Sequence, residues 1–241
     1  MSKILVGVPT YSGHKYCFDE FAEGLKQTIT ADILFVVNNG EDAYMRWIKS
    51  KGFHAVENPK PAKEPKEHIL NNRNYLRDYF LGLDYDYLLL VSSDVILPKK
   101  TLEVLILQKK DIVAGAYLNL FKLDQLVVAP KMFKDKGNGE AQLYTYKGMF
   151  PGRLEQIGAA GLGCVLLSRN ALEKTKFEAN DIMFYVNARK NGLETYGLTA
   201  VRCTHRVHPK ENEMSKHFEW NTNYEDNVWE IDSKEIFNKR Q

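Results

Sequence analysis

Short apolar runs alternate with amphipathic stretches along the first half of the chain. The runs have the length and β-branched content of buried strands and lie at residues 3–8, 33–37, 53–56 and 87–91. The stretches between them place apolar residues at helical spacing and predict helices at residues 16–29, 41–51 and 68–81. Residues 58–67, with three prolines, predict a loop. This alternation is typical of an α/β fold, a mostly parallel central sheet flanked by helices.

Polar, small-residue segments follow three of the predicted strands. They read PTYSG, NNGED and SSDVILP, and they begin at Pro9, Asn38 and Ser92. Ligands of open α/β sheets bind beyond the carboxyl ends of the strands. We therefore expect these three segments to line one ligand cleft.

The second half is less regular. Strands are predicted at residues 111–118, 126–129, 163–168 and 200–204, a helix at 181–190, and a hairpin at 131–146 that turns at 135–139. The glycine-rich residues 149–163 predict a mobile loop. The polar residues 211–241, which contain Trp220 and Trp229, predict a tail that packs on the domain or on a partner.

Composition narrows the class of protein. The chain has 241 residues, 44% of them hydrophobic and 27% charged, as in one ordinary globular domain. With 33 basic and 31 acidic residues it gives no strong nucleic-acid signal. Its three cysteines are widely spaced, which argues against a disulfide framework and a Cys–Cys zinc pair. There is no 18-residue apolar run and no signal-peptide core at the start, so we expect a soluble, cytoplasmic protein without an integral membrane segment.

Asp94 is the first candidate for chemistry. It follows the most apolar strand, and Ser92 and Asp94 project to the same side of an extended chain, with Ser93 between them. Mg²⁺ commonly takes one or two carboxylates together with phosphate oxygens, so this segment is suited to a metal–diphosphate. The alternative is that Asp94 only turns the chain before Pro98.

For two further candidates, spacing alone favours a structural role over a chemical one. His205 ends the apolar segment TAVRCTH, and a neutral imidazole binds divalent metals, although a lone histidine is more often structural. Asp181 opens the predicted helix at 181–190. It could accept a proton from an attacking hydroxyl, whereas Asn180 or Asp181 as a helix cap is the structural alternative.

Other residues near the strand ends could contact a nucleotide. Tyr11 could stack on a base, and the amides of Asn38 and Asn39 could bind a base edge, although ordinary turn chemistry explains all three. Arg73 could reach a diphosphate, or it could be solvated. Residues 158–163 read GAAGLG, but a strand follows them instead of a helix, which argues against a dinucleotide fingerprint and favours a substrate-contacting loop that includes Gly161. Arg153 is a candidate phosphate contact in the same loop.

Taken together, these segments resemble the A-type (GT-A) glycosyltransferases, close to the family-2-like group, over residues 3–208. VGVPTY is similar to the family's opening strand, and NRN at 72–74 to its A-R-N helix segment. LLLVSSDVILP resembles the L-D-x-D-x-x-x-P metal motif, with Ser92 at the first acid and Asp94 at the metal-binding one. FEANDIMFYVNARKNG resembles the E-D-x-x-F-x-x-R-x-x-x-G stretch, and VRCTH the strand that ends in a metal-contacting histidine. Asn38 and Asn39 stand where acids contact uracil in the family, and Asn180 replaces a glutamate.

The resemblance implies a Rossmann-like GT-A fold with a smaller mixed acceptor-side region. It implies one glycosyltransferase domain at residues 1–210, of which 1–118 bind the nucleotide sugar and 119–210 form the acceptor side. The donor would be a UDP- or GDP-linked sugar, a hexose, bound by Pro9, Thr10, Tyr11, Asn38, Asn39, Arg73, Ser92, Ser93, Asp94, Arg153 and Gly161. Mn²⁺ or Mg²⁺ would bind Asp94 and His205, and Asp181 would be the base of an inverting single displacement.

Two other classes of function stay open at this point. Ser92, Asn38, Asn39 and Asn180 replace four acids, so the chain could be a non-catalytic sugar-nucleotide or glycan-binding module. It could also be a sugar nucleotidyltransferase, although PTYSGHK offers only one glycine for a phosphate loop. The acceptor class, whether lipid, glycan, protein or nucleic acid, is open too, because fold does not fix function.

Overall fold

A computed structural model describes residues 2–28, 31–122, 126–137, 141–145, 147–150 and 152–206. The predicted tail at 211–241 lies outside these residues. No helix in the described part of the chain is both long and apolar enough to cross a membrane.

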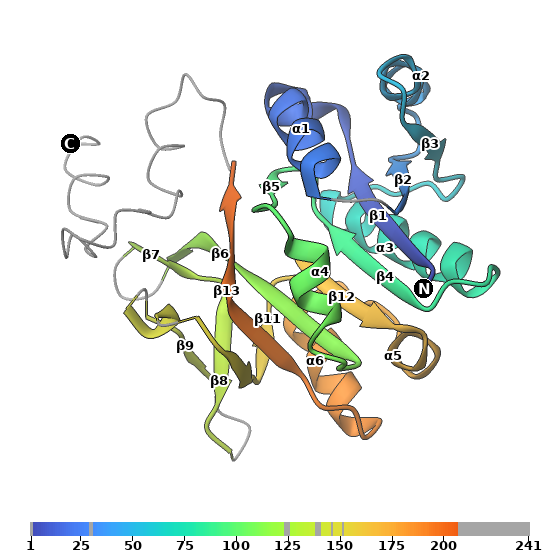
Figure 1. Ribbon diagram of the computed structural model, residues 1–241. Coiled ribbons are helices and arrows are strands. Elements are labelled where there is room, and N and C mark those ends of the chain that lie inside the picture. The colour runs from blue at the N-terminus through green and yellow to red at the C-terminus, as the bar shows by residue number, and fades with distance from the viewer. Residues whose placement is uncertain are drawn as a thin grey trace, which may run out of the picture.

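The first half forms the parallel part of the sheet (Figure 1). Its strands are β1 (Ile4–Thr10), β2 (Asp32–Val37), β3 (His54–Glu57) and β4 (Tyr87–Val91). Its helices are the 3₁₀ helix η1 (Ser12–Cys17), α1 (Phe18–Thr28), α2 (Asp42–Ser50) and α3 (Pro65–Leu81). β1 pairs in parallel with β2 and β4, and β2 pairs in parallel with β3. The α/β prediction is confirmed. One boundary differs: α3 begins at Pro65, inside the predicted loop at 58–67, because proline suits the first turn of a helix.

The second half continues the same sheet. The added strands are β5 (Val95–Ile96), β6 (Ile112–Lys122), β7 (Leu126–Pro130), β10 (Leu154–Gln156), β12 (Cys164–Ser168) and β13 (Tyr196–His205). The strand order is β10-β13-β6-β12-β4-β1-β2-β3, with β5 on β13 and β7 on β6. β12 is antiparallel to both β4 and β6, so the sheet becomes mixed at β12.

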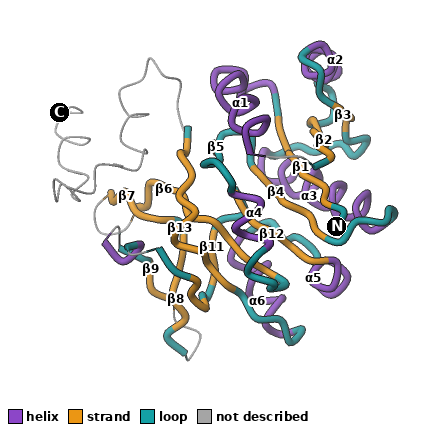
Figure 2. Tube along the Cα trace, in the orientation of Figure 1, coloured by secondary structure: helices purple, strands orange, loops and turns teal. Residues whose placement is uncertain are grey.

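Helices cover both faces of this sheet, as Figure 2 shows with strands in orange and helices in purple. The remaining helices are α4 (Thr101–Ile106), α5 (Arg169–Lys174), α6 (Asp181–Lys190) and the 3₁₀ helix η2 (Lys147–Met149). Leu88 and Leu90 of β4 pack in the cluster that includes α3, α5 and α6, whereas Leu89 and Val91 pack in the one with α1, α2 and α4. This strict alternation along a fully buried strand explains its continuous apolar run.

A small second sheet lies beside the second half. It contains β8 (Met132–Asp135), β9 (Ala141–Leu143) and β11 (Ala159–Ala160) in the order β11-β8-β9. β8 and β9 are antiparallel, which confirms the predicted hairpin, and Gly137 in its turn has φ +78°. Residues 138–140 of that turn are outside the described residues.

The prediction of a mobile loop at 149–163 is wrong. Its residues supply β10 and β11, and residues 157–163 are buried. Gly158 donates its N–H to the Phe133 carbonyl, and Gly161 donates to the Lys131 carbonyl. A Cβ on Gly161 would collide with the Tyr117 hydroxyl. The glycines serve close packing rather than mobility, because only glycine lets the backbone pass so near these groups.

Candidate active site

The three polar segments meet at one end of the sheet, as the sequence predicts. They border a cavity of about 470 Å³ at the carboxyl ends of β1, β2 and β4. Seven predicted site residues line it: Pro9, Thr10, Tyr11, Asn38, Arg73, Ser92 and Asp94. Five lining residues were not predicted, namely His14, Pro65, His68, Ile69 and Asn72. The topology therefore brings segments 80 residues apart to one cavity.

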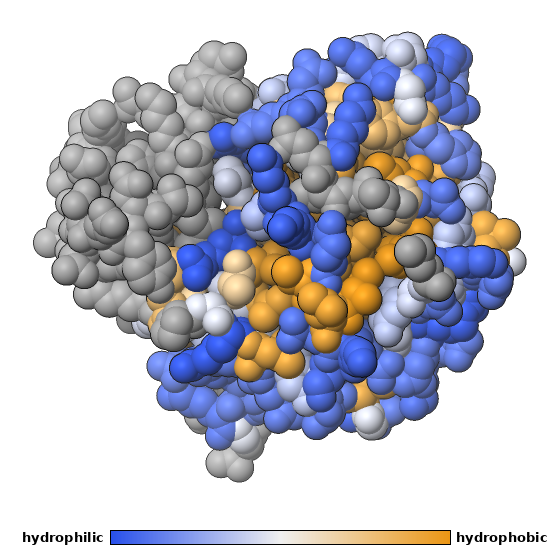
Figure 3. Space-filling model, in the orientation of Figure 1, coloured by the Kyte–Doolittle hydropathy of each residue, from blue (hydrophilic) through white to orange (hydrophobic). Residues whose placement is uncertain are grey.

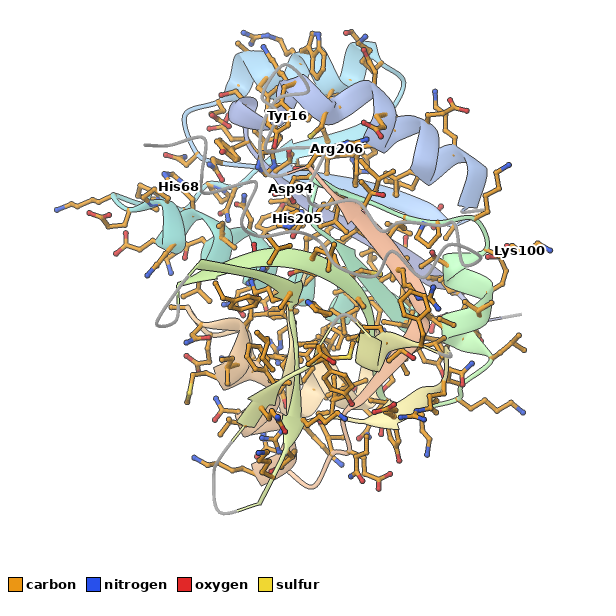
Figure 4. All side chains as sticks on the ribbon, turned by 90° about the vertical axis from the view of Figure 1, so that its left-hand side faces the viewer. Tyr16, His68, Asp94, Lys100, His205 and Arg206 are labelled. Carbon is orange, nitrogen blue, oxygen red and sulfur yellow. The ribbon has the colours of Figure 1, made fainter. Side chains whose placement is uncertain are left out.

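Asp94 lies between two imidazoles. Its Oδ2 is 3.4 Å from His205 Nε2 and 3.6 Å from His14 Nε2. Its own carbonyl accepts the Arg206 N–H at 2.7 Å, which joins the end of β13 to the segment after β4. Figure 4 shows Asp94, His205 and Arg206 close together, with Lys100 well apart. The predicted association of Asp94 with His205 is present in the structure.

The second ring nitrogen of each histidine is held by a neighbour. His205 Nδ1 lies 2.7 Å from the Leu118 carbonyl, an acceptor only, so Nδ1 carries a proton and Nε2 is the nitrogen turned toward Asp94. His14 Nδ1 is 2.7 Å from the Ser93 hydroxyl. These contacts fix both rings with Nε2 toward the carboxylate, the orientation that outer-shell partners give to metal-binding histidines.

The electrostatic environment keeps Asp94 ionised. Burial alone would raise its pKa, but the hydrogen bond and charge of His205, with the charge of His14, lower that pKa to about 2. Burial lowers the pKa of His14, and Asp94 opposes this only in part. Asp94 is therefore a carboxylate at neutral pH, and His14 is a neutral imidazole.

Asp181 is the centre of a second cluster. Its Oδ1 accepts from Arg73 Nη1 at 2.6 Å, and its Oδ2 accepts from Lys131 Nζ at 2.7 Å and from the Leu162 N–H at 3.4 Å. Burial would raise the pKa of Asp181, but the two cations hold it well below its ordinary value. Lys131 was not predicted, because a lysine 50 residues away in sequence gives no signal for this contact.

Arg73 and Tyr117 connect the two clusters. Arg73 lines the cavity and binds Asp181, and its buried Nε has no hydrogen-bond partner within the described residues. The buried Tyr117 ring contacts the His205 ring edge-on, with centroids 5.0 Å apart, and the Lys131 ammonium lies 6.0 Å from the centroid of the Tyr117 ring. Arg73 thus joins the cavity that Asp94 lines to the carboxylate of Asp181, and Tyr117 lies between His205 and Lys131.

Six predicted site residues do not line the cavity. Two of them, His205 and Asp181, contact the lining residues Asp94 and Arg73, and the other four lie elsewhere. Asn39 donates its Nδ2 to the Pro59 carbonyl at 3.4 Å. Ser93 is buried behind His14, and Gly161 lies under Tyr117, beside Lys131. Arg153 pairs with Glu155 on β10, apart from the cavity.

A larger hollow, of about 860 Å³, lies at the opposite end of the parallel strands. Apolar side chains gather over this face in Figure 3, and Leu83, Leu102 and Leu107 line the hollow. It borders the amino ends of the strands, whereas ligands of open α/β sheets bind at the carboxyl ends. The smaller cavity is the better candidate because it has the buried carboxylate, the histidines and Arg73.

No protein-family model matches the sequence, and no curated protein matches it. Among solved structures, GalNAc-T7, described with UDP, GalNAc and Mn²⁺, is similar at a TM-score of 0.59 and 8% identity over 85% of this chain and 44% of that one. TarS from S. aureus is similar at 0.50 and 16% identity, over 81% of this chain and 35% of that one. A CMP:2-keto-3-deoxy-manno-octonic acid synthetase complexed with CTP is similar at a TM-score of 0.48 and 8% identity, over 82% of this chain and 89% of that one. The chain thus spans less than half of either of the first two proteins, and the likeness confirms the fold, a GT-A glycosyltransferase fold.

Proposed function

From this fold and this site, we propose that the protein transfers a sugar, a hexose, from a nucleoside-diphosphate sugar to an acceptor hydroxyl. The observation that carries the proposal is the grouping of Asp94 and His14, on the wall of a cavity at the carboxyl ends of β1, β2 and β4, with His205 beside Asp94. Arg73 connects that cavity to the second carboxylate, Asp181. A site for a diphosphate and a site for a proton acceptor are therefore adjacent, as group transfer between two molecules requires.

The cavity residues suggest how the donor is held. The Tyr11 ring is 43% exposed and lines the cavity, so it can stack on a base. The unpartnered Arg73 Nε can donate to a phosphate or sugar oxygen, since guanidinium groups suit such acceptors. Ser92 and Thr10 add hydroxyls on the same lining. The family resemblance implies a UDP- or GDP-linked donor.

The residues around Asp94 fit a divalent cation. Among the described residues no three His, Cys, Asp or Glu side chains form a complete metal cluster by themselves. Cations that act on diphosphates commonly take only one or two protein ligands, because phosphate oxygens complete the set. Asp94 and His205 would hold the ion, with His14 within reach, and imidazoles suit Mn²⁺ better than Mg²⁺. When bound, the ion would neutralise the charge of the departing nucleoside diphosphate.

We propose Asp181 as the base. The acceptor oxygen forms a bond to the anomeric carbon, the bond from that carbon to the diphosphate oxygen breaks, and the acceptor proton passes to Asp181, with inversion. Arg73 and Lys131 orient this carboxylate, and they also make it a weak base. A weak base suffices for this step because the hydroxyl becomes strongly acidic as its oxygen attacks.

Donor binding after metal removal tests the function. Calorimetric titration of the EDTA-treated protein with nucleotide sugars should show binding that strengthens on adding Mn²⁺, and Asp94→Asn should abolish the Mn²⁺ effect. Asp84→Asn removes an exposed carboxylate at the amino ends of the strands and serves as the matched control.

Each of the other outcomes would support a different function for this protein. If Asp94→Asn keeps the Mn²⁺ effect, the metal role is wrong. Donor binding without turnover on any acceptor would identify the non-catalytic module. Pyrophosphate release from a nucleoside triphosphate and a sugar phosphate would identify a nucleotidyltransferase.

A further inference from the structure

A chain of three side-chain amides leads from the protein interior to the cavity. Asn58 Nδ2 donates to Asn72 Oδ1 at 3.0 Å, and Asn72 Nδ2 donates to Asn38 Oδ1 at 2.8 Å. Asn58 and Asn72 are both 2% exposed, and Asn72 and Asn38 line the cavity. The orientation of the last amide therefore depends on the first two.

Two backbone groups determine which atom of each buried amide donates and which accepts. The Lys60 N–H, which can only donate, is bound by Asn58 Oδ1 at 2.9 Å. The Val36 carbonyl, which can only accept, is bound by Asn72 Nδ2 at 3.2 Å. An amide flip at Asn58 or Asn72 would set donor against donor or acceptor against acceptor, so the network assigns each oxygen and nitrogen.

Asn38 consequently meets the cavity as a donor. Its Oδ1 is turned to the buried Asn72, and within the described residues its Nδ2 has no partner. The Nδ2 hydrogens are the group that Asn38 offers to a bound molecule. The exposed ring of Tyr11 lines the same cavity and provides a stacking surface for a planar base.

We propose that Asn38 makes the cavity select a nucleobase whose Watson–Crick edge presents a ring-nitrogen acceptor, cytosine N3 or adenine N1, over one whose ring nitrogen carries hydrogen. With Asn38 Nδ2 opposite the ring nitrogen, uracil N3–H and guanine N1–H would set a second donor against the Asn38 donor, and one group would lose its hydrogen bond unless the base shifted to present O4 or O6. Cytosine and adenine accept from it. This inference rests on the proposed nucleotide site, and it replaces the uracil or guanine expected from the family resemblance.

Titration with four nucleoside diphosphates tests the selection. In the presence of Mn²⁺, the wild-type protein should bind CDP or ADP about ten-fold or more tightly than UDP and GDP, the scale set by one unpaired buried group. The CDP and ADP arms identify which of the two acceptor bases the site takes. UDP or GDP binding as tightly as the others would overturn the selection while leaving a nucleotide site in place. No binding of any of the four would overturn the proposed function as well.

Two neighbouring variants separate Asn38 from general effects of charge. In Asn38→Asp one carboxylate oxygen still accepts from Asn72 and the other offers an acceptor, so the preference should reverse toward UDP and GDP. Asn39→Asp makes the same chemical change one residue later, on a side chain that binds the Pro59 carbonyl and does not line the cavity. Its preference should match the wild type, and an unchanged preference in Asn38→Asp would rule out the role of Asn38.

Discussion

Asn180 and Asp181 stand at the start of α6, where the sequence left helix capping and proton acceptance as alternatives. Asn180 is the N-cap of α6, and its Oδ1 accepts the Ile182 N–H at 2.9 Å. Asp181 is consequently not needed as a cap, and its oxygens are bound by Arg73 and Lys131. The cap expectation is met by Asn180, and the base role proposed for Asp181 does not compete with it, because adjacent side chains at a helix start point in different directions.

Asp181→Asn should separate chemistry from donor binding. The variant keeps an acceptor for Arg73 but cannot take a proton, so transfer should fall by about 10²–10⁴-fold while the donor affinity changes little. Single-turnover transfer and calorimetric binding, measured on the same folded preparation, check this. Turnover within a few-fold of the wild type would count against the base assignment.

The same residue predicts how stability depends on pH. The folded-state pKa of Asp181 lies below its ordinary value of 3.8, so its contribution is complete above that value and is lost as the pH falls from about 4 toward the lower folded-state pKa. Asp181→Asn should therefore be less stable than the wild type at pH 7, and the difference should shrink at pH 2–3. Urea denaturation across that range measures it, and a constant difference would contradict the ion-pair explanation.

Among the elements, short helices were the hardest to predict. α4 has six residues and was not predicted from the sequence, because a single turn and a half gives little periodicity. It begins after Lys100, which has φ +62°, and it buries Leu102 and Leu105 against the sheet. Longer α6 was predicted with the bounds observed, and Gly192 at φ +76° follows its end.

The cap of α6 supplies a test at this scale. Asn180→Ala should lower the free energy of unfolding by about 1 kcal/mol, because the Ile182 N–H loses its acceptor. Asn180→Asp retains an acceptor oxygen and should be close to neutral. Urea denaturation of the three proteins measures the effect, and equal losses in both variants would show that the cap bond is not what Asn180 contributes.

For the whole molecule, the continuous sheet makes the two predicted halves interdependent. β4 of the first half pairs with β12 of the second, and β12 pairs in turn with β6. A fragment of residues 1–118 keeps β4 but removes its partner β12, leaving Leu88 and Leu90 without part of the cluster around them. The first half therefore lacks a complete core of its own.

Unfolding experiments should show that the two halves depend on each other. The full chain should unfold in one cooperative thermal transition, and the fragment of residues 1–118 should show none. Circular dichroism and calorimetry of both proteins check the prediction. A sharp transition in the fragment, with nucleotide binding, would instead identify two independent domains.

The sequence by itself determined the four strands of the first half, the long helices and the edge of the sheet where the cavity lies. Those features depend on local patterns: a short apolar run such as Leu88–Val91, followed by polar turn residues, favours a buried strand and marks where that strand ends. Asp94 and Asn38 were found in this way, and the structure places both on one cavity.

Only the tertiary structure decided which groups meet. His14 faces Asp94 across 80 residues, Arg73 binds Asp181 across 108, and the direction of the Asn38 amide depends on Val36, Asn58 and Asn72. These relations follow from strand order and side-chain direction, which no local pattern encodes. Gly161 and Gly163 show the same limit, because their place under Tyr117 is a matter of packing between distant strands.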